Sequence, residues 1–115
     1  MDIAQPDIGS CGGITGARHI SAIAQSLGVR VNPHVWGSAV AQAASLHVIA
    51  ALPVAHHSLF ATEPVLEYDC SSHPFRHDLV DQPLTMINGW VEVSDRPGLG
   101  INVNREIIQK YDVLQ

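Results

Sequence analysis

Residues 4–15 decide the fold of this chain, and they read Ala4-Gln5-Pro6-Asp7-Ile8-Gly9-Ser10-Cys11-Gly12-Gly13-Ile14-Thr15. The stretch predicts the end of a buried strand, then an acid, then a glycine-rich turn that opens a helix. A second stretch, Val29-Arg30-Val31-Asn32-Pro33-His34-Val35-Trp36-Gly37, predicts a β-branched strand that ends in a histidine. Ligands of parallel sheets bind where the carboxyl ends of the strands meet. We therefore expect Asp7 and His34 to form a catalytic pair at one sheet edge.

The residues between and after these strands predict two helices and a third strand. Thr15 can cap a helix that runs to about Leu27, and Gly28 suits the left-handed position after its end. A second helix, from residue 39 to about residue 52, is apolar nearly all round, so we expect it to be sandwiched between other elements. Residues 54–64 predict a loop, and Val65–Asp69 a third strand. The order β-α-β-α-β predicts an α/β protein with a parallel sheet and right-handed crossovers.

After residue 69 the predicted alternation of strands and helices ends. Residues 70–83 predict a loop with one helical turn over about 76–80. Asn88-Gly89 lies between the short apolar runs 84–86 and 90–93, which is a strong hairpin pattern. Residues 95–100 predict a turn rich in Pro and Gly. Asn104 caps a last short helix from Arg105 to about Tyr111.

Composition restricts the class of protein. The chain has 115 residues, which is one domain or part of one, with 46% hydrophobic and only 15% charged residues. Soluble domains average about 25% charged residues, so much of this chain is expected to be buried, more than it can bury alone. The net charge of −5, without a basic run, argues against a nucleic-acid partner. No membrane span or signal peptide is expected, and two cysteines predict reduced thiols in the cytoplasm.

Three polar residues are the candidate catalytic groups: Asp7, His34 and Glu67. A carboxylate that bonds one imidazole nitrogen fixes the tautomer and makes the other nitrogen available for proton transfer. We expect Asp7 to orient His34 in this way, and Glu67 to transfer a proton or bind a substrate oxygen. The alternative from the residues alone is that Asp7 caps its own turn and His34 is a satisfied buried histidine.

Two further patterns point to binding. Gly12 and Gly13 free backbone amides at a helix start, which suits a carboxylate or phosphate, although a tight packing turn explains them equally well. Trp36 follows His34 by two residues and either lines a pocket or anchors packing. Residues 70–77 contain Cys70, His73 and His77 at spacings compatible with zinc, but Pro74 interrupts the helix that this would need. We assign no metal ligand in this chain.

Several motifs in order resemble a known family. They are Gln5-Pro6-Asp7 with Gly12-Gly13-Ile14-Thr15, then Pro33-His34-Val35-Trp36-Gly37, Leu66-Glu67-Tyr68-Asp69, and Pro97-Gly98-Leu99-Gly100-Ile101. Together they resemble the enolase superfamily, within it the mandelate racemase and muconate lactonizing enzyme subgroup. Within that subgroup they resemble the sugar-acid dehydratases and galactarolactone cycloisomerase-like members.

The resemblance implies a partial (β/α) barrel. Residues 1–83 would form strands six to eight of a TIM-type barrel with two intervening helices, and residues 84–115 a hairpin and short helix that return toward an absent capping domain. Asp7 and His34 match the family's acid–histidine dyad, and Glu67 matches the acid on strand eight. The implied reaction removes the proton α to a carboxylate of an acid sugar, with Mg²⁺ stabilising the enediolate.

The chain also departs from the family. The three carboxylate ligands of Mg²⁺ and the lysine on strand two have no counterpart in this sequence. We therefore expect a catalytically incomplete fragment of a dehydratase, cycloisomerase or racemase, inactive alone. The alternative is a non-catalytic assembly or binding module, whose apolar faces pair with a second copy or a partner chain.

Overall fold

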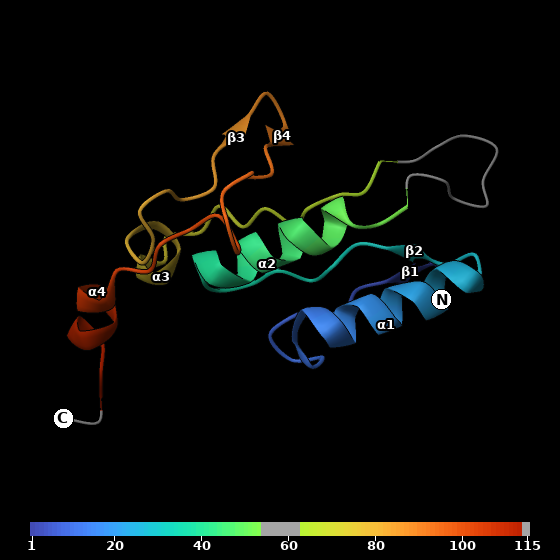
Figure 1. The fold of residues 1–115 in the computed structure, drawn as a ribbon, viewed down its shortest axis with the longest axis horizontal. Coiled ribbons are helices and arrows are strands. Elements are labelled where there is room, and N and C mark those ends of the chain that lie inside the picture. The colour runs from blue at the N-terminus through green and yellow to red at the C-terminus, as the bar shows by residue number, and fades with distance from the viewer. Residues whose placement is uncertain (54–62, 114–115) are drawn as a thin grey trace.

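The computed structural model describes residues 1–53 and 63–113. It contains four helices and four short strands within these residues (Figure 1). In chain order the elements are β1 (Ile3–Ala4), α1 (Gly13–Ser26), β2 (Arg30–Val31), α2 (Ala39–Ala50), α3 (Pro74–His77), β3 (Met86–Ile87), β4 (Trp90–Val91) and α4 (Arg105–Lys110). None of these helices is long and apolar enough to cross a membrane.

The predicted parallel strand pair is confirmed. β1 and β2 pair in parallel, with Ile3 opposite Arg30 and Ala4 opposite Val31, and α1 forms the crossover between them. An isolated parallel bridge between Asp7 and His34 continues this pairing beyond the two strands. The backbone therefore brings these two residues side by side at the carboxyl ends of β1 and β2, as expected.

Helix α1 begins earlier than predicted. It starts at Gly13, and Gly12 precedes it in a left-handed conformation (φ 94°), with no side chain capping the helix end. Glycine carries no Cβ and adopts this conformation without steric strain, so the backbone itself turns into the helix before Thr15 is reached. At the other end Gly28 has φ 72°, which confirms the predicted left-handed residue after the helix.

Helix α2 is the most buried element. The Ser38 side chain caps it by accepting the Ala41 N–H at 3.3 Å. Eight of its residues are buried: Ala39, Gln42, Ala43, Ala44, Ser45, Leu46, Val48 and Ile49. Ala17 of α1 packs against Ala44 and Val48 on one side of α2, and Leu79 and Val80, which follow α3, pack against Ala39 at its start. The prediction of a sandwiched helix is confirmed.

The third strand predicted over Val65–Asp69 is not formed. These residues have neither helix nor strand conformation, because no described segment pairs with their backbone. Side chains hold them instead, since Glu67 bonds the backbone of Val35 and Asp69 bonds Arg76. The loop predicted over residues 54–64 lies largely outside the described residues.

The C-terminal elements are close to those predicted. Asn88 and Gly89 both have positive φ (51° and 83°) and join antiparallel β3 and β4, so the predicted hairpin is confirmed. Asn104 caps α4, accepting from Glu106 N–H at 3.0 Å. Helix α3, in contrast, begins at Pro74 and ends at His77, because proline suits a first helical position. Val80 instead pairs with Val103 in an antiparallel bridge.

Candidate functional site

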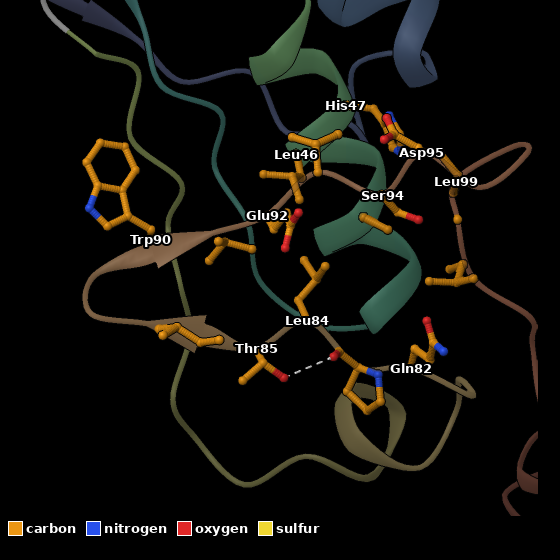
Figure 2. Close-up of a pocket in the computed structure, with 17 residues that line it drawn as sticks. Leu46, His47, Gln82, Leu84, Thr85, Trp90, Glu92, Ser94, Asp95 and Leu99 are labelled. Carbon is orange, nitrogen blue, oxygen red and sulfur yellow. Dashed lines mark hydrogen bonds between the residues drawn. The ribbon is translucent and has the colours of Figure 1, made fainter.

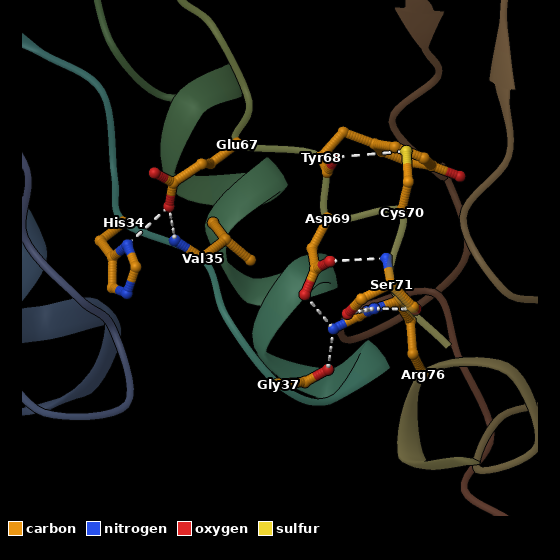
Figure 3. A network of polar contacts seen from close by, with 9 residues as sticks. All are labelled: His34, Val35, Gly37, Glu67, Tyr68, Asp69, Cys70, Ser71 and Arg76. Carbon is orange, nitrogen blue, oxygen red and sulfur yellow. Dashed lines mark hydrogen bonds and ion pairs between the residues drawn. The ribbon is translucent and has the colours of Figure 1, made fainter. Parts of the chain in front are cut away.

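The side chains of His34 and Glu67 are in contact (Figure 3). His34 Nδ1 lies 2.6 Å from Glu67 Oε2, and the two side chains are 48% and 45% exposed. The same carboxylate oxygen accepts the backbone N–H of Val35 at 2.6 Å. Glu67 thus holds both the histidine ring and the backbone that follows it.

This contact determines the state of the imidazole. Two atoms with only lone pairs would repel at 2.6 Å, so a proton must lie between Nδ1 and the carboxylate. When His34 is neutral, its single ring proton is on Nδ1, so Nε2 carries the free lone pair. Nε2 points away from Glu67 (Figure 3), and within residues 1–53 and 63–113 it has no hydrogen-bond partner. The arrangement can accept a proton at Nε2 and stabilise the resulting imidazolium at Nδ1.

The predicted hydrogen bond between Asp7 and His34 is not formed. The Asp7 carboxylate accepts the Gly9 N–H at 2.8 Å and the Ser10 hydroxyl at 2.9 Å, both within its own turn. Partners two and three residues away cost little chain entropy to reach, so aspartate closes such turns readily. The Asp7 carbonyl also accepts the Ser10 and Cys11 N–H groups. Asp7 therefore caps its turn beside His34, and Glu67 takes the orienting position expected of Asp7.

The predicted binding residues Gly12, Gly13 and Trp36 are partly or fully exposed. Gly12 and Gly13 both have positive φ and form the turn that opens α1. Trp36 is 70% exposed, and its ring meets the His73 ring edge-on at 6.3 Å. The structure thus places Trp36 next to the site without burying it, and its role in binding stays a prediction.

A second polar network lies beside the first, and sequence reasoning missed it. The guanidinium of Arg76 bonds the Asp69 carboxylate, the Gly37 carbonyl (3.2 Å) and the Ser71 carbonyl (2.6 Å). The Ser71 N–H and then the Arg76 charge hold the pKa of Asp69 below its usual range. The only available signal was an arginine following Pro74-Phe75 in a chain with very few cations.

A similar network closes the C-terminal turn. Asp81 accepts the Asn102 N–H at 2.8 Å, the Asn102 side-chain amide at 2.9 Å and Arg96 at 2.9 Å. These donors, the Asn102 backbone first, lower the pKa of Asp81 far below its usual range. This network joins the segment after α3 to the segment before α4, and it lies apart from His34.

Two metal sites come into question for this chain: a zinc site at residues 70–77 and the Mg²⁺ site of the family that it resembles. In the described ranges no three His, Cys, Asp or Glu side chains come together as a metal site would require. Cys70, His73 and His77 therefore do not form one there. The described residues likewise do not fit the Mg²⁺ that the resemblance implies.

The two larger grooves flank the hairpin and not the His34–Glu67 pair. One, of about 750 Å³, lies between α2 and residues 82–101 and includes His47, Trp90 and Asp95 (Figure 2). The other, of about 510 Å³, lies between the end of α2, residues 63–68 and β4. Both are lined mainly by apolar atoms, whereas the titratable pair sits on an open surface. Chemistry therefore locates the candidate site better than cavity size does.

The chain contains a parallel strand–helix–strand unit with an acid and a histidine at the strand ends, an arrangement found in β/α barrels and in open parallel α/β sheets. Residues 1–107 match the family described as enolase C-terminal domain-like, and the chain belongs to that family. This confirms the resemblance to the enolase superfamily and its mandelate racemase subgroup.

Two curated proteins and a solved structure show which members are similar. The chain is 40% identical over 111 residues to D-galactarolactone cycloisomerase of Agrobacterium fabrum, covering 96% of this chain and 29% of that protein. It is 30% identical over 111 residues to D-gluconate dehydratase of Thermoproteus tenax, covering 96% of this chain and 21% of that protein. The crystal structure of 3,6-anhydro-D-galactonate cycloisomerase from Zobellia galactanivorans matches with a TM-score of 0.82 and 33% identity, over 96% and 29% of the two chains. The chain thus spans less than a third of these relatives.

Proposed function

We propose that this chain supplies the proton-transfer end of an active site that acts on an acid sugar. The observation that carries the proposal is the 2.6 Å contact between His34 Nδ1 and Glu67, which leaves His34 Nε2 as the free basic atom. The similar relatives are named as a cycloisomerase and a dehydratase of sugar acids or their lactones. Both names agree with the removal of a proton α to a carboxyl group, the reaction class that the family resemblance implies.

Each residue of the site has its own proposed role in proton transfer or substrate binding. His34 Nε2 removes or returns the α-proton, and Glu67 stabilises the imidazolium through Nδ1. Asp7 holds the turn next to His34, so that its carboxylate and the Gly12–Gly13 turn border the substrate. Trp36 covers one side of the same surface.

Mg²⁺ is the metal that enolase-superfamily enzymes generally use, and it supplies stabilisation of the enediolate. The described part of this chain does not fit it, so we assign no residue here to the metal. In this proposal residues 1–83 correspond to strands six to eight of a barrel and residues 84–115 to the returning tail. The chain alone is then inactive, and the missing ligands come from another polypeptide segment.

Exposed apolar surface supports the need for a covering partner. A compact monomer of this mass exposes about 6,100 Å², whereas this chain exposes 7813 Å². The excess of roughly 1,700 Å² lies on one chain, and it is about twice the roughly 800 Å² that each partner buries in a standard protein–protein interface. The radius of gyration, 15.3 Å, likewise exceeds the roughly 13 Å of a compact domain this long. The exposed side chains gather on the outer face of α1 (Ile20, Ile23, Leu27) and on the hairpin (Ile87, Trp90).

A chimaera tests the proposed chemistry. The corresponding segment of the Agrobacterium cycloisomerase is replaced by this chain, and turnover is measured with and without Mg²⁺. We expect activity that His34→Gln lowers about 10²- to 10⁴-fold, the contribution of a positioned general base. His19→Gln, on the exposed face of α1, is the matched control and leaves turnover unchanged. An active chimaera that tolerates His34→Gln would refute the role given to His34.

Experiments on the isolated chain test its proposed inactivity and its proposed need for a partner. Incubation with a panel of acid sugars and Mg²⁺ should give no product, and turnover that disappears in His34→Ala would overturn the claim of inactivity. Mass measured in solution across a concentration series should show self-association. A well-folded monomer at every concentration would contradict the need for a partner, and would also remove the case for a non-catalytic assembly module.

A further inference from the structure

Arg76 is a charged residue inside the protein. Its side chain is 3% exposed, in a chain that has only six lysines and arginines. Burying an ion is costly unless fixed partners satisfy its hydrogen bonds. The two terminal nitrogens of Arg76 have such partners in Asp69, the Gly37 carbonyl, and the carbonyl and hydroxyl of Ser71, whereas Nε has none among the described residues.

These partners belong to two segments that carry the candidate catalytic pair (Figure 3). Asp69 follows Glu67 by two residues, and Gly37 follows His34 by three. Residues 65–69 have no strand ladder in the described structure to hold them against the segment after β2. The guanidinium makes the connection that a ladder would make, since Nη2 of Arg76 donates to both the Gly37 carbonyl oxygen and Asp69 Oδ2.

We propose that Arg76 is a positioning residue for the His34–Glu67 contact. It fixes the distance between the two segments, so that Glu67 Oε2 reaches both His34 Nδ1 and the Val35 N–H. The inference rests on the proposed function for its biological meaning, because it assigns the residue that keeps the proton-transfer pair assembled. The pair is about half exposed and cannot hold itself, since ion pairs at the surface contribute little.

The arginine side chain suits this task and lysine does not. A guanidinium presents several donors in a rigid plane, and here both terminal nitrogens are used, one by Ser71 and one by Asp69 and Gly37. A lysine ammonium is a single point with rotatable donors, and it cannot bond both segments at the same separation. Arg76→Lys therefore keeps the charge and breaks the connection.

The test compares Arg76→Lys with Arg96→Lys in the 115-residue chain. Arg96 also pairs with an aspartate, Asp81, but lies away from the site, so it is the matched control. Two readouts are followed by NMR: hydrogen exchange of the Val35 amide, and the ¹⁵N shifts of the His34 ring. The Val48 amide, in the middle of α2, reports global unfolding.

The expected result is local. In Arg76→Lys the Val35 amide exchanges at least about tenfold faster, equivalent to 1.4 kcal/mol of opening. The His34 ring nitrogens lose the Nδ1–H tautomer signature and move toward the averaged shifts of free histidine. The Val48 amide and the Arg96→Lys variant keep wild-type values. Equal acceleration of Val35 and Val48, or an unchanged His34 tautomer, would overturn the inference.

A second variant covers the case in which Arg76→Lys does not fold. Asp69→Asn removes one partner while leaving the arginine in place, and it should show the same two local changes. If both variants unfold the chain entirely, Arg76 is a stability residue and the inference fails. Neither readout depends on turnover. A chimaera without His34-dependent activity would therefore refute the proposed function while the Arg76 result could still stand.

Discussion

Replacing Gly16 by alanine should destabilise this chain, although the same change stabilises most helices. Gly16 is the fourth residue of α1, and alanine in a helix ordinarily gains about 1 kcal/mol over glycine. A Cβ built at this position, however, would lie 1.9 Å from the Cys11 carbonyl oxygen and 2.9 Å from its carbonyl carbon. Both are backbone atoms, so no side-chain rotation relieves the clash.

The magnitude follows from what must move. Atoms in contact sit about 3.5 Å apart, so the turn before α1 has to shift by roughly 1.5 Å. Overpacking of this kind costs about 1–3 kcal/mol. The shift also disturbs the bonds from the Ser10 and Cys11 amides to the Asp7 carbonyl, at about 1 kcal/mol each. After the helix gain is subtracted, we expect a net loss of about 2–4 kcal/mol.

Urea unfolding followed by circular dichroism measures this loss at one fixed protein concentration. Ala22→Gly, at an exposed position of the same helix, calibrates the propensity term and should cost about 1 kcal/mol. Amide shifts of Ser10 and Cys11 should change in Gly16→Ala and not in Ala22→Gly. A Gly16→Ala chain that is as stable as wild type or more so would refute the close approach of the turn to α1.

Other predictions concern the core, a helix cap and acid stability. Val48→Ala, in the buried face of α2, should lower the free energy of unfolding by about 2 kcal/mol, measured by urea unfolding. Val103→Ala, on the surface, should lower it by well under about 1 kcal/mol in the same assay. Ser38→Ala removes the cap of α2 and should lower the midpoint of thermal unfolding by about 4 °C, for a loss of about 1 kcal/mol; an unchanged midpoint would contradict the cap. The pKa values of Asp69 and Asp81 lie below the ordinary 3.8, so the unfolded chain binds more protons as the pH falls. The stability that these carboxylates contribute is therefore complete above about pH 4 and lost below it, and Asp81→Asn should flatten the acid limb of a stability–pH curve.

The local elements of this fold were predictable because their causes act within a few residues. Glycine after a helix, serine before one, and Asn88-Gly89 in a hairpin each act through steric freedom or a single nearby hydrogen bond. Helix α1 starts before Thr15, the residue that the sequence pattern predicts as its cap, because the left-handed Gly12 turns the chain sooner. A glycine's φ cannot be read from the sequence alone.

The pairing of charges was less predictable. Aspartate and histidine at neighbouring strand ends predicted that Asp7 orients His34, and the backbone does bring them side by side. The carboxylate nevertheless bonds its own turn, because partners two or three residues away are always within reach. Glu67 contacts His34 only because the chain folds back after α2, and no spacing in the sequence encodes that return.

The sequence by itself determined the strand–helix–strand unit that opens the chain, the family it resembles, and the placement of Asp7 and His34 at the ends of its two strands. These depend on hydrophobic periodicity, on turn chemistry and on motifs that are contiguous along the chain. Only the tertiary structure decided which acid contacts His34, and that a buried Arg76 connects the two segments of the site. Such contacts join residues far apart in the chain, so their geometry exists only after packing around α2 has set the distance between the segments.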